Sequence, residues 1–226
     1  MTNKSKTTAP SQAEQNVGEI LSKTDQFIEK YLKQIIIAVA AIVLIVVAVI
    51  GVRHMYLLPK EKEAQAAIFP AERYLSLQQW DMALNGDSLN RAGFVSIIDD
   101  YSFTKTGNLA KAYAGICSYH LGDFESAVKY LKDYKRKDEL VSSVVDGLLG
   151  DCYVDLGETQ TAIGYFNKVA KSNSGSLSPI YLKKVALAYE SLGNKKDALD
   201  AYNTIKTKYP ESQEASGIDK YIERVK

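Results

Sequence analysis

An unbroken run of apolar residues, Ile35 to Val52, constrains this chain more than any other feature of its sequence. Lys33 precedes the run, and Arg53 follows it directly. A helix rises about 1.5 Å per residue, so these eighteen residues would cover about 27 Å. The hydrocarbon core of a bilayer is roughly 30 Å thick. The run therefore predicts a single transmembrane helix over residues 35–52.

Two other interpretations of the run are weaker. A cleaved signal peptide has a shorter apolar region and small residues at its cleavage site. Here 34 residues precede the run, and Val49, Ile50 and Val52 occupy the place of a cleavage site. A helix that is apolar on all sides could also be buried, but only within a large protein. We therefore expect an uncleaved anchor followed by an extramembrane domain.

The segments that flank the run are helical or unstructured in character. Residues 1–16 are polar and predict a disordered tail. Apolar residues in 17–34 recur at helical spacing, which predicts a juxtamembrane amphipathic helix. It would lie in the membrane interface, pair with a partner, or simply extend the span. After the run, Pro59 predicts a break, and a further amphipathic helix to about Gln79 is expected to kink or break at Pro70.

The rest of the chain has an internal period of 35 to 36 residues, set by turn-like glycines. Around these glycines the same residue types recur at fixed offsets. The glycines are Gly86, Gly122, Gly157 and Gly193; seven residues before the last three lie Gly115, Gly150 and Ala186, five residues after them Ala127, Ala162 and Ala198, and four further on Leu131, Phe166 and Tyr202. Such a period predicts stacked copies of one helical unit.

This pattern resembles the tetratricopeptide repeat, a helix–turn–helix unit of about 34 residues. The resemblance implies that the small residues let paired helices approach closely, while each bulky residue fills the gap between neighbouring repeats. We expect a helical lead-in with a degenerate repeat over 59–106, in which Arg91 takes the alanine position, and repeats with a C-terminal capping helix over 107–226. The predicted fold class is all-α: one transmembrane helix followed by a tetratricopeptide-repeat α-solenoid.

The sequence offers no recognisable catalytic or cofactor site. Motifs of nucleotide binding, zinc proteolysis and serine hydrolysis are absent. Its 28 basic and 27 acidic residues are interspersed, which argues against nucleic-acid binding. Asp151 and Asp155 share a helix face and could bind a metal, although such pairs are more typical of a solvated face. Cys117 and Cys152 occupy equivalent repeat positions and are expected to stay unpaired. We predict no enzyme activity, no cofactor and no metal.

Protein binding is the function that the repeats imply, in a groove lined by the first helix of each repeat. The register places eleven residues there: Leu109, Ala112, Ile116, Tyr119 and His120 from the first copy, Asp151, Val154 and Asp155 from the second, and Lys183, Leu187 and Glu190 from the third. This mixture suits a peptide segment with an aliphatic anchor. Ile116 and Tyr119 are the best candidates to hold that anchor, unless Ile116 is simply part of the core between helices.

Taken whole, the architecture resembles bacterial single-span proteins that carry such repeats outside the inner membrane, including the ancillary Sec-translocon subunit family. The resemblance implies an inner-membrane protein with periplasmic repeats. Its partners would be other proteins, such as the translocon or periplasmic chaperones, and not nucleic acid. Two alternatives remain open: a structural subunit of an envelope assembly, for outer-membrane assembly or cell division, and an enzyme whose site the sequence hides.

Overall fold

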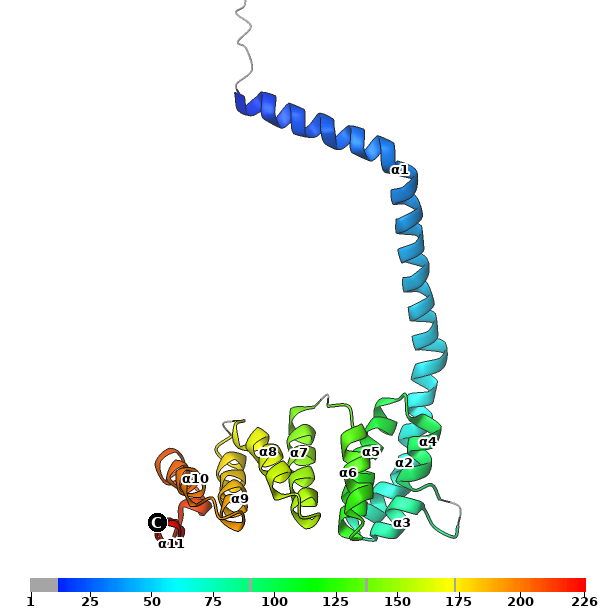
Figure 1. Cartoon of the computed structure of the whole chain (residues 1–226). Helices are drawn as coiled ribbons and strands as arrows, with labels where there is room; N and C mark the ends of the chain where they lie inside the picture. The colour runs from blue at the N-terminus through cyan, green and yellow to red at the C-terminus, as the bar shows by residue number, and fades with distance from the viewer. Residues whose placement is uncertain (1–11, 90, 137, 173) are drawn as a thin grey trace, which may run out of the picture. The chain divides into compact units, whose positions relative to one another are not determined.

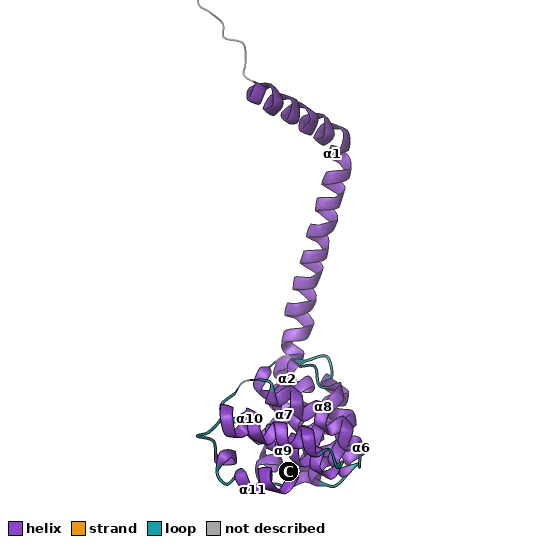
Figure 2. Cartoon of the chain, turned by 60° about the vertical axis from the view of Figure 1, so that its left-hand side comes forward, coloured by secondary structure: helices purple, strands orange, loops and turns teal. Residues whose placement is uncertain are grey.

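The computed structural model describes the backbone of residues 12–89, 91–136, 138–172 and 174–226, and the side chains from Lys30 onward. Within these ranges the chain contains helices, turns and loops but no strand (Figure 2). It divides into two compact units, Met1–Leu58 and Pro59–Lys226. The helical composition confirms the predicted all-α fold class.

The first unit includes helix α1, Gln12–Val52, which contains the whole apolar run. The helix begins earlier than expected: residues 12–16, assigned to a disordered tail, are helical, while residues 1–11 lie outside the described residues. The backbone of 17–34 is helical and continues into the span, but the side chains that would show an amphipathic face lie largely outside the described residues. Its role as interfacial, pairing or simple extension stays open.

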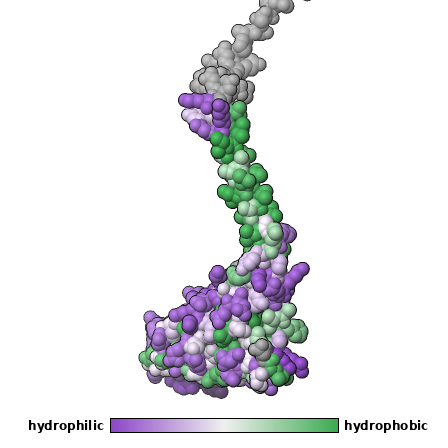
Figure 3. Space-filling view, turned by 90° about the vertical axis from the view of Figure 1, so that its right-hand side faces the viewer, coloured by the Kyte–Doolittle hydropathy of each residue, from purple (hydrophilic) through white to green (hydrophobic). Residues whose placement is uncertain are grey.

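The apolar run is exposed along its length, as the continuous green segment of Figure 3 shows. Leu44 is 70% exposed and Ile37 is 68% exposed. In the described part of the chain, one helical stretch, Lys30–Ser76, is long and apolar enough to cross a membrane. A membrane anchor and a signal sequence both have this character at an N-terminus. Exposure of so many large aliphatic side chains is unfavourable in water and favourable in lipid.

The predicted break at Pro59 is wrong, because the helical backbone passes through this region. A π-helical turn, η1, spans Arg53–Leu57, and α2 follows at Leu58–Ser76. The Leu58 N–H donates to the carbonyl of Arg53, five residues back. A proline lacks the N–H of a regular helical bond, and its ring clashes with the carbonyl four residues earlier. The wider turn immediately before Pro59 accommodates both effects. Pro70 likewise lies inside α2 without ending it, so of the kink or break predicted there the break does not occur.

Three helix pairs form the predicted repeats and follow one another along the second unit (Figure 1). Their first helices are α5 (Lys105–His120), α7 (Glu139–Asp155) and α9 (Leu177–Ser191), and their second helices are α6 (Phe124–Asp133), α8 (Thr159–Ala170) and α10 (Lys195–Lys208). A 3-10 turn, η2 (Gln213–Ala215), and a final helix, α11 (Asp219–Val225), close the series. Ile222 and Val225 of α11 are buried, as a closing helix requires.

The degenerate copy before these repeats contains two short helices, α3 (Trp80–Asn85) and α4 (Phe94–Tyr101). Arg91, which takes the alanine position by register, lies in the loop between them and not in a helix. The helix pair is therefore incomplete in this copy. Phe94 and Ile97 of α4 are nevertheless fully buried against α5 and α2.

The period of the sequence arises from a repeated turn at the end of each first helix. Gly122, Gly157 and Gly193 have φ of 80°, 77° and 73°, a left-handed conformation that glycine adopts without strain. In each turn the residue after the glycine donates its N–H to the carbonyl five residues back, at 2.8 to 2.9 Å. This is the Schellman arrangement. Asp123 and Asn194 then cap the next helix by accepting from the backbone N–H three residues on.

In the first two repeats, the glycine seven residues before the turn packs on the bulky residue of its own repeat. A Cβ added at Gly115 would lie 2.5 Å from Leu131, and one added at Gly150 would lie 2.3 Å from Phe166. The bulky residue was expected to fill the gap between neighbouring repeats, but this contact is within one repeat. Phe166 also reaches the next repeat, where its ring centroid lies 6.0 Å from that of Tyr181. The small residue therefore fixes the spacing of the two helices within a repeat.

Both cysteines are fully buried and free. Cys117 belongs to a core cluster shared by α2, α3, α4 and α5, and Cys152 belongs to the cluster that runs from α5 to α11. Burial raises the pKa of each thiol to about 12. Their side chains therefore act as small apolar groups in the packing of α5 and α7.

The start of α2 is bonded to the start of α5 through Glu61. Its carboxylate accepts the Lys105 backbone N–H at 2.7 Å and the Thr106 hydroxyl at 2.7 Å. Burial raises the pKa of Glu61, but these bonds and one from Gln65 outweigh it and hold the pKa below the ordinary value. A carboxylate at a helix N-terminus also interacts favourably with the helix dipole. This contact joins α2 to the first complete repeat.

Candidate functional site

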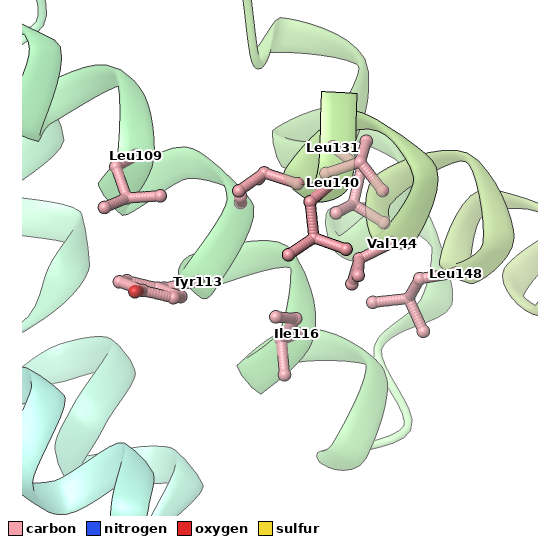
Figure 4. A pocket seen from close by; sticks show the side chains of 10 residues that line it. Leu109, Tyr113, Ile116, Leu131, Leu140, Val144 and Leu148 are labelled. Carbon is pink, nitrogen blue, oxygen red and sulfur yellow. The ribbon is translucent and has the colours of Figure 1, made fainter. Parts of the chain in front are cut away.

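An apolar cavity of about 210 Å³ opens between α5 and α7, the first helices of two successive repeats. Ten residues line it, and Figure 4 shows their side chains converging on it: Leu109, Ala112, Tyr113 and Ile116 from α5, Leu131 from α6, and Leu140, Val141, Val144, Val145 and Leu148 from α7. None of them is charged. A cavity of about 150 Å³ is already large enough for benzene. The site is therefore suited to one bulky apolar side chain.

The mouth of the cavity is open to solvent on the α7 side. Leu140 is 68% exposed and Val144 is 48% exposed, while Val145 and Leu131 form a fully buried floor. Single exposed aliphatic residues are common on protein surfaces, but here they border a cavity with apolar walls. A docked apolar group would cover these side chains and remove them from water.

We call the contact between α5 and α7 the first seam and the contact between α7 and α9 the second. The cavity exists because the first seam carries smaller side chains than the second. Val145 of α7 is twelve residues before its turn glycine, and Tyr181 stands at that position in α9. The Tyr181 hydroxyl fills the space that a Cβ at Gly147 would occupy, at 1.9 Å from it. In the first seam Ala112 replaces that glycine, and the valine cannot reach across. The volume that the tyrosine fills between α7 and α9 is thus empty between α5 and α7.

Three of the residues expected to bind a partner lie together in this cavity: Leu109, Ala112 and Ile116. Leu109 and Ile116 are half-buried, and Ala112 is only 2% exposed, so it contributes a wall and not a free surface. Ile116 was considered either a partner contact or a core residue. Its position at the wall of an open cavity is compatible with the first role.

Tyr119 and His120 follow at the end of α5 and differ in their surroundings. The Tyr119 ring packs on Phe124, with centroids 5.6 Å apart. Burial, followed by the charges of Asp155 and Asp151 and a hydrogen bond with Asp155, raises the pKa of Tyr119 to about 12. His120 instead stacks on Trp80 of α3, with centroids 4.1 Å apart and planes at 10°. The His120 ring is therefore already in contact with another residue of the same chain.

Asp151, Val154 and Leu187 line a second pocket of about 250 Å³, bordered by α7, α8 and α9. Lys184 lies in the same pocket, and its Nζ is 2.6 and 2.7 Å from the two Asp151 carboxylate oxygens. The charge of Asp151 is therefore balanced within the protein. This pocket is more polar than the cavity between α5 and α7, and an apolar ligand would have to lie against an ion pair.

Lys183 and Glu190 face the closing helix and not the cavity. The Lys183 ammonium lies 5.0 Å from the centroid of the Tyr221 ring. Glu190 accepts hydrogen bonds from Tyr202 and Arg224, at 2.5 and 2.9 Å. Burial raises the pKa of Glu190, but these bonds outweigh it and lower the pKa overall. Both residues attach α11 to the last repeat, so the structure does not bring them together with the other candidate residues.

The sequence reasoning missed the α7 side of the cavity: Leu140, Val144 and Leu148. The repeat register directed attention to Asp151, Val154 and Asp155, which lie further along the same helix. A signal was present, because residues 140, 144 and 148 form an apolar stripe at i, i+4 and i+8. In the described residues no group of three or more histidine, cysteine or acidic side chains could hold a metal ion.

The tetratricopeptide-repeat family matches two stretches of the chain, residues 148–176 and 184–212. The first runs from the middle of α7 past the end of α8, and the second runs from the middle of α9 past the end of α10. Among curated proteins, none matches the chain. Tetratricopeptide repeats generally bind other proteins. The match and the structure together show tetratricopeptide-type helical repeats that follow one long apolar N-terminal helix.

Proposed function

We propose that this protein is a membrane-anchored scaffold that binds a segment of a partner protein through a bulky apolar side chain. One observation carries the proposal: the solvent-open, almost entirely apolar cavity between α5 and α7. Interfaces obtain most of their energy from a few anchors that fill such pockets. The eleven candidate residues divide accordingly. Those near the cavity contact the partner, and Lys183 and Glu190 stabilise the repeat series.

The same proposal assigns the apolar run to a membrane anchor and the repeats to the periplasmic side of a bacterial inner membrane. The run is long enough to span the bilayer, and its side chains are exposed. The resemblance to single-span repeat proteins of the bacterial envelope supports this side and a role in handing proteins between a translocon and periplasmic chaperones. Protease added to spheroplasts should digest the repeats; complete protection would reverse the topology.

Site-specific photo-crosslinking tests the binding site. A benzoylphenylalanine at Val144, on the rim of the cavity, should crosslink to partner proteins in intact membranes. The same probe at Asn203, an exposed position of α10, is the control and should give no such product. Equal crosslinking from both positions would contradict a specific site at the cavity.

A cavity-filling variant separates the cavity from the rest of the surface. The double substitution Ala112→Gly and Val145→Tyr copies into the first seam the two residues that fill the second, Gly147 and Tyr181. It should fold normally, because this pair already packs in the same chain, and it should lose the Val144 crosslinks. A folded double variant that keeps all its crosslinks would show that partners do not use the cavity.

A further inference from the structure

The cavity lies at one end of a stripe of side chains along α7, and two aspartates lie at the other end. Val144, Leu148, Asp151 and Asp155 are spaced by four, three and four residues, which places them on one face of the helix. Val144 and Leu148 line the cavity. A segment that is anchored there and runs along α7 toward its C-terminal end would therefore pass over the two aspartates.

The two aspartates are not equivalent. Lys184 holds both oxygens of Asp151, so that carboxylate is already paired. Asp155 is exposed, and none of the ion pairs among the described residues includes it. It interacts with the Tyr119 side chain, which contributes a neutral hydroxyl. The stripe thus ends in one carboxylate without a countercharge, beside an aromatic ring from α5.

The separation of the cavity and Asp155 sets the spacing of a ligand. The midpoint of Val144 and Leu148 is nine residues from Asp155, or about 13 Å along the axis of α7. In an extended peptide, residues i and i+4 lie on the same face and about 13 Å apart. An extended segment is also narrow enough to lie along two neighbouring helices whose axes are about 10 Å apart.

We propose that the groove binds an extended segment of a partner protein in which a bulky apolar residue fills the cavity and a lysine or arginine four residues away pairs with Asp155. This inference rests on the proposed function and adds the chemistry and spacing of the ligand. The long aliphatic stem of lysine or arginine would lie against the Tyr119 ring, and its charge would reach the carboxylate.

Selection from a randomised twelve-residue peptide library displayed on phage tests the inference, with the full-length protein in nanodiscs as bait. Selected peptides should share a leucine, isoleucine, methionine or phenylalanine with a lysine or arginine four positions away, in either direction. Selection on Asp155→Lys should replace the basic residue with an acidic one and keep the apolar residue. Asp155→Asn, which keeps an acceptor for Tyr119, should abolish the basic preference without creating an acidic one.

Two controls separate failure of this inference from failure of the proposed function. Asp200→Lys makes the same charge reversal at an exposed position of α10 and should leave the selected motif unchanged. The cavity-filling double variant should lose the apolar preference. For a peptide selected on the wild type, Asp155→Lys should weaken binding by about fivefold or more.

The outcomes are distinct. An apolar preference with no basic residue, or with one at another spacing, would overturn the proposed pairing with Asp155 and leave the cavity as the binding site. Absence of any enriched motif on the wild type would count against peptide binding in the groove, and so against the proposed function itself. A basic preference that survives in both Asp155 variants would assign the cation to another carboxylate and refute the inference.

Discussion

Gly150 provides the strictest test of how the repeats are packed, because the chain contains a matched control. In α7 a Cβ at Gly150 would lie 2.3 Å from the Cε1 atom of Phe166. In α8 a Cβ at Gly164 would meet nothing within 4 Å. Both glycines are in helix interiors, so Gly150→Ala and Gly164→Ala differ chiefly in this one contact.

The magnitude of the difference follows from two terms. Replacing glycine by alanine inside a helix stabilises it by roughly 0.5–1 kcal/mol, and this gain is common to both variants. Phe166 is only 2% exposed and packs on the Tyr181 ring, so its own ring has little room to move away. Overpacking of this kind costs about 1–3 kcal/mol. The free energy of unfolding of Gly150→Ala should therefore be about 1–3 kcal/mol below that of Gly164→Ala.

Urea and thermal unfolding of the full-length protein in detergent, followed by far-ultraviolet circular dichroism, measure this difference. For a domain of this size each kcal/mol changes the melting temperature by roughly 2–4 °C. Gly164→Ala should equal or exceed the wild type in stability. If the two variants unfolded together, the close approach of α7 and α8 at Gly150 would not determine the packing of the repeat.

Three further outcomes are expected. The protein should stay in the membrane pellet after alkaline extraction, since residues 35–52 are apolar throughout; release into the supernatant, detected by immunoblot, would argue against an anchor. Glu61→Gln should lower the melting temperature at pH 7. Because the folded pKa of Glu61 is depressed, its stabilisation is present above the unfolded pKa of about 4.3 and is lost as the pH falls through the folded value, so the two melting temperatures should converge as the pH is lowered below the unfolded pKa. Cys117 and Cys152 should resist a thiol reagent in the native protein and react in urea; rapid modification of the native protein would show that α5 and α7 open readily.

The helical repeats could be predicted from the sequence because their determinants are local. A left-handed residue is needed to end each first helix, and glycine supplies it at a constant period, as Gly122 and Gly157 show. The same local reasoning failed at Pro59. There a proline that normally ends a helix is accommodated by a π-helical turn, which depends on the whole backbone path and not on the proline alone.

The cavity could not be predicted from the repeat pattern, because it depends on residues that meet across two repeats. Val145 is an ordinary apolar residue in its own helix, and only comparison with Tyr181 reveals that it is too short. Ile116, which the register assigns to the partner groove, lines the cavity. It also grouped Glu190 with Ile116, although Glu190 binds Arg224 of the closing helix. Repeat register identifies equivalent positions but not the neighbours that each position meets.

In such a chain, the positions at which the repeats differ are therefore expected to serve binding. The positions that the repeats share are expected to determine the fold. The turn glycines and the small residues that face Leu131 and Phe166 recur because every helix pair has to close in the same way. Where Tyr181 fills the second seam, a valine leaves the first one open to a ligand. A protein that required only a rigid solenoid would gain stability by filling both seams, since an unfilled apolar cavity loses packing interactions. The smaller side chain beside an exposed apolar rim fits a surface that a partner protein completes.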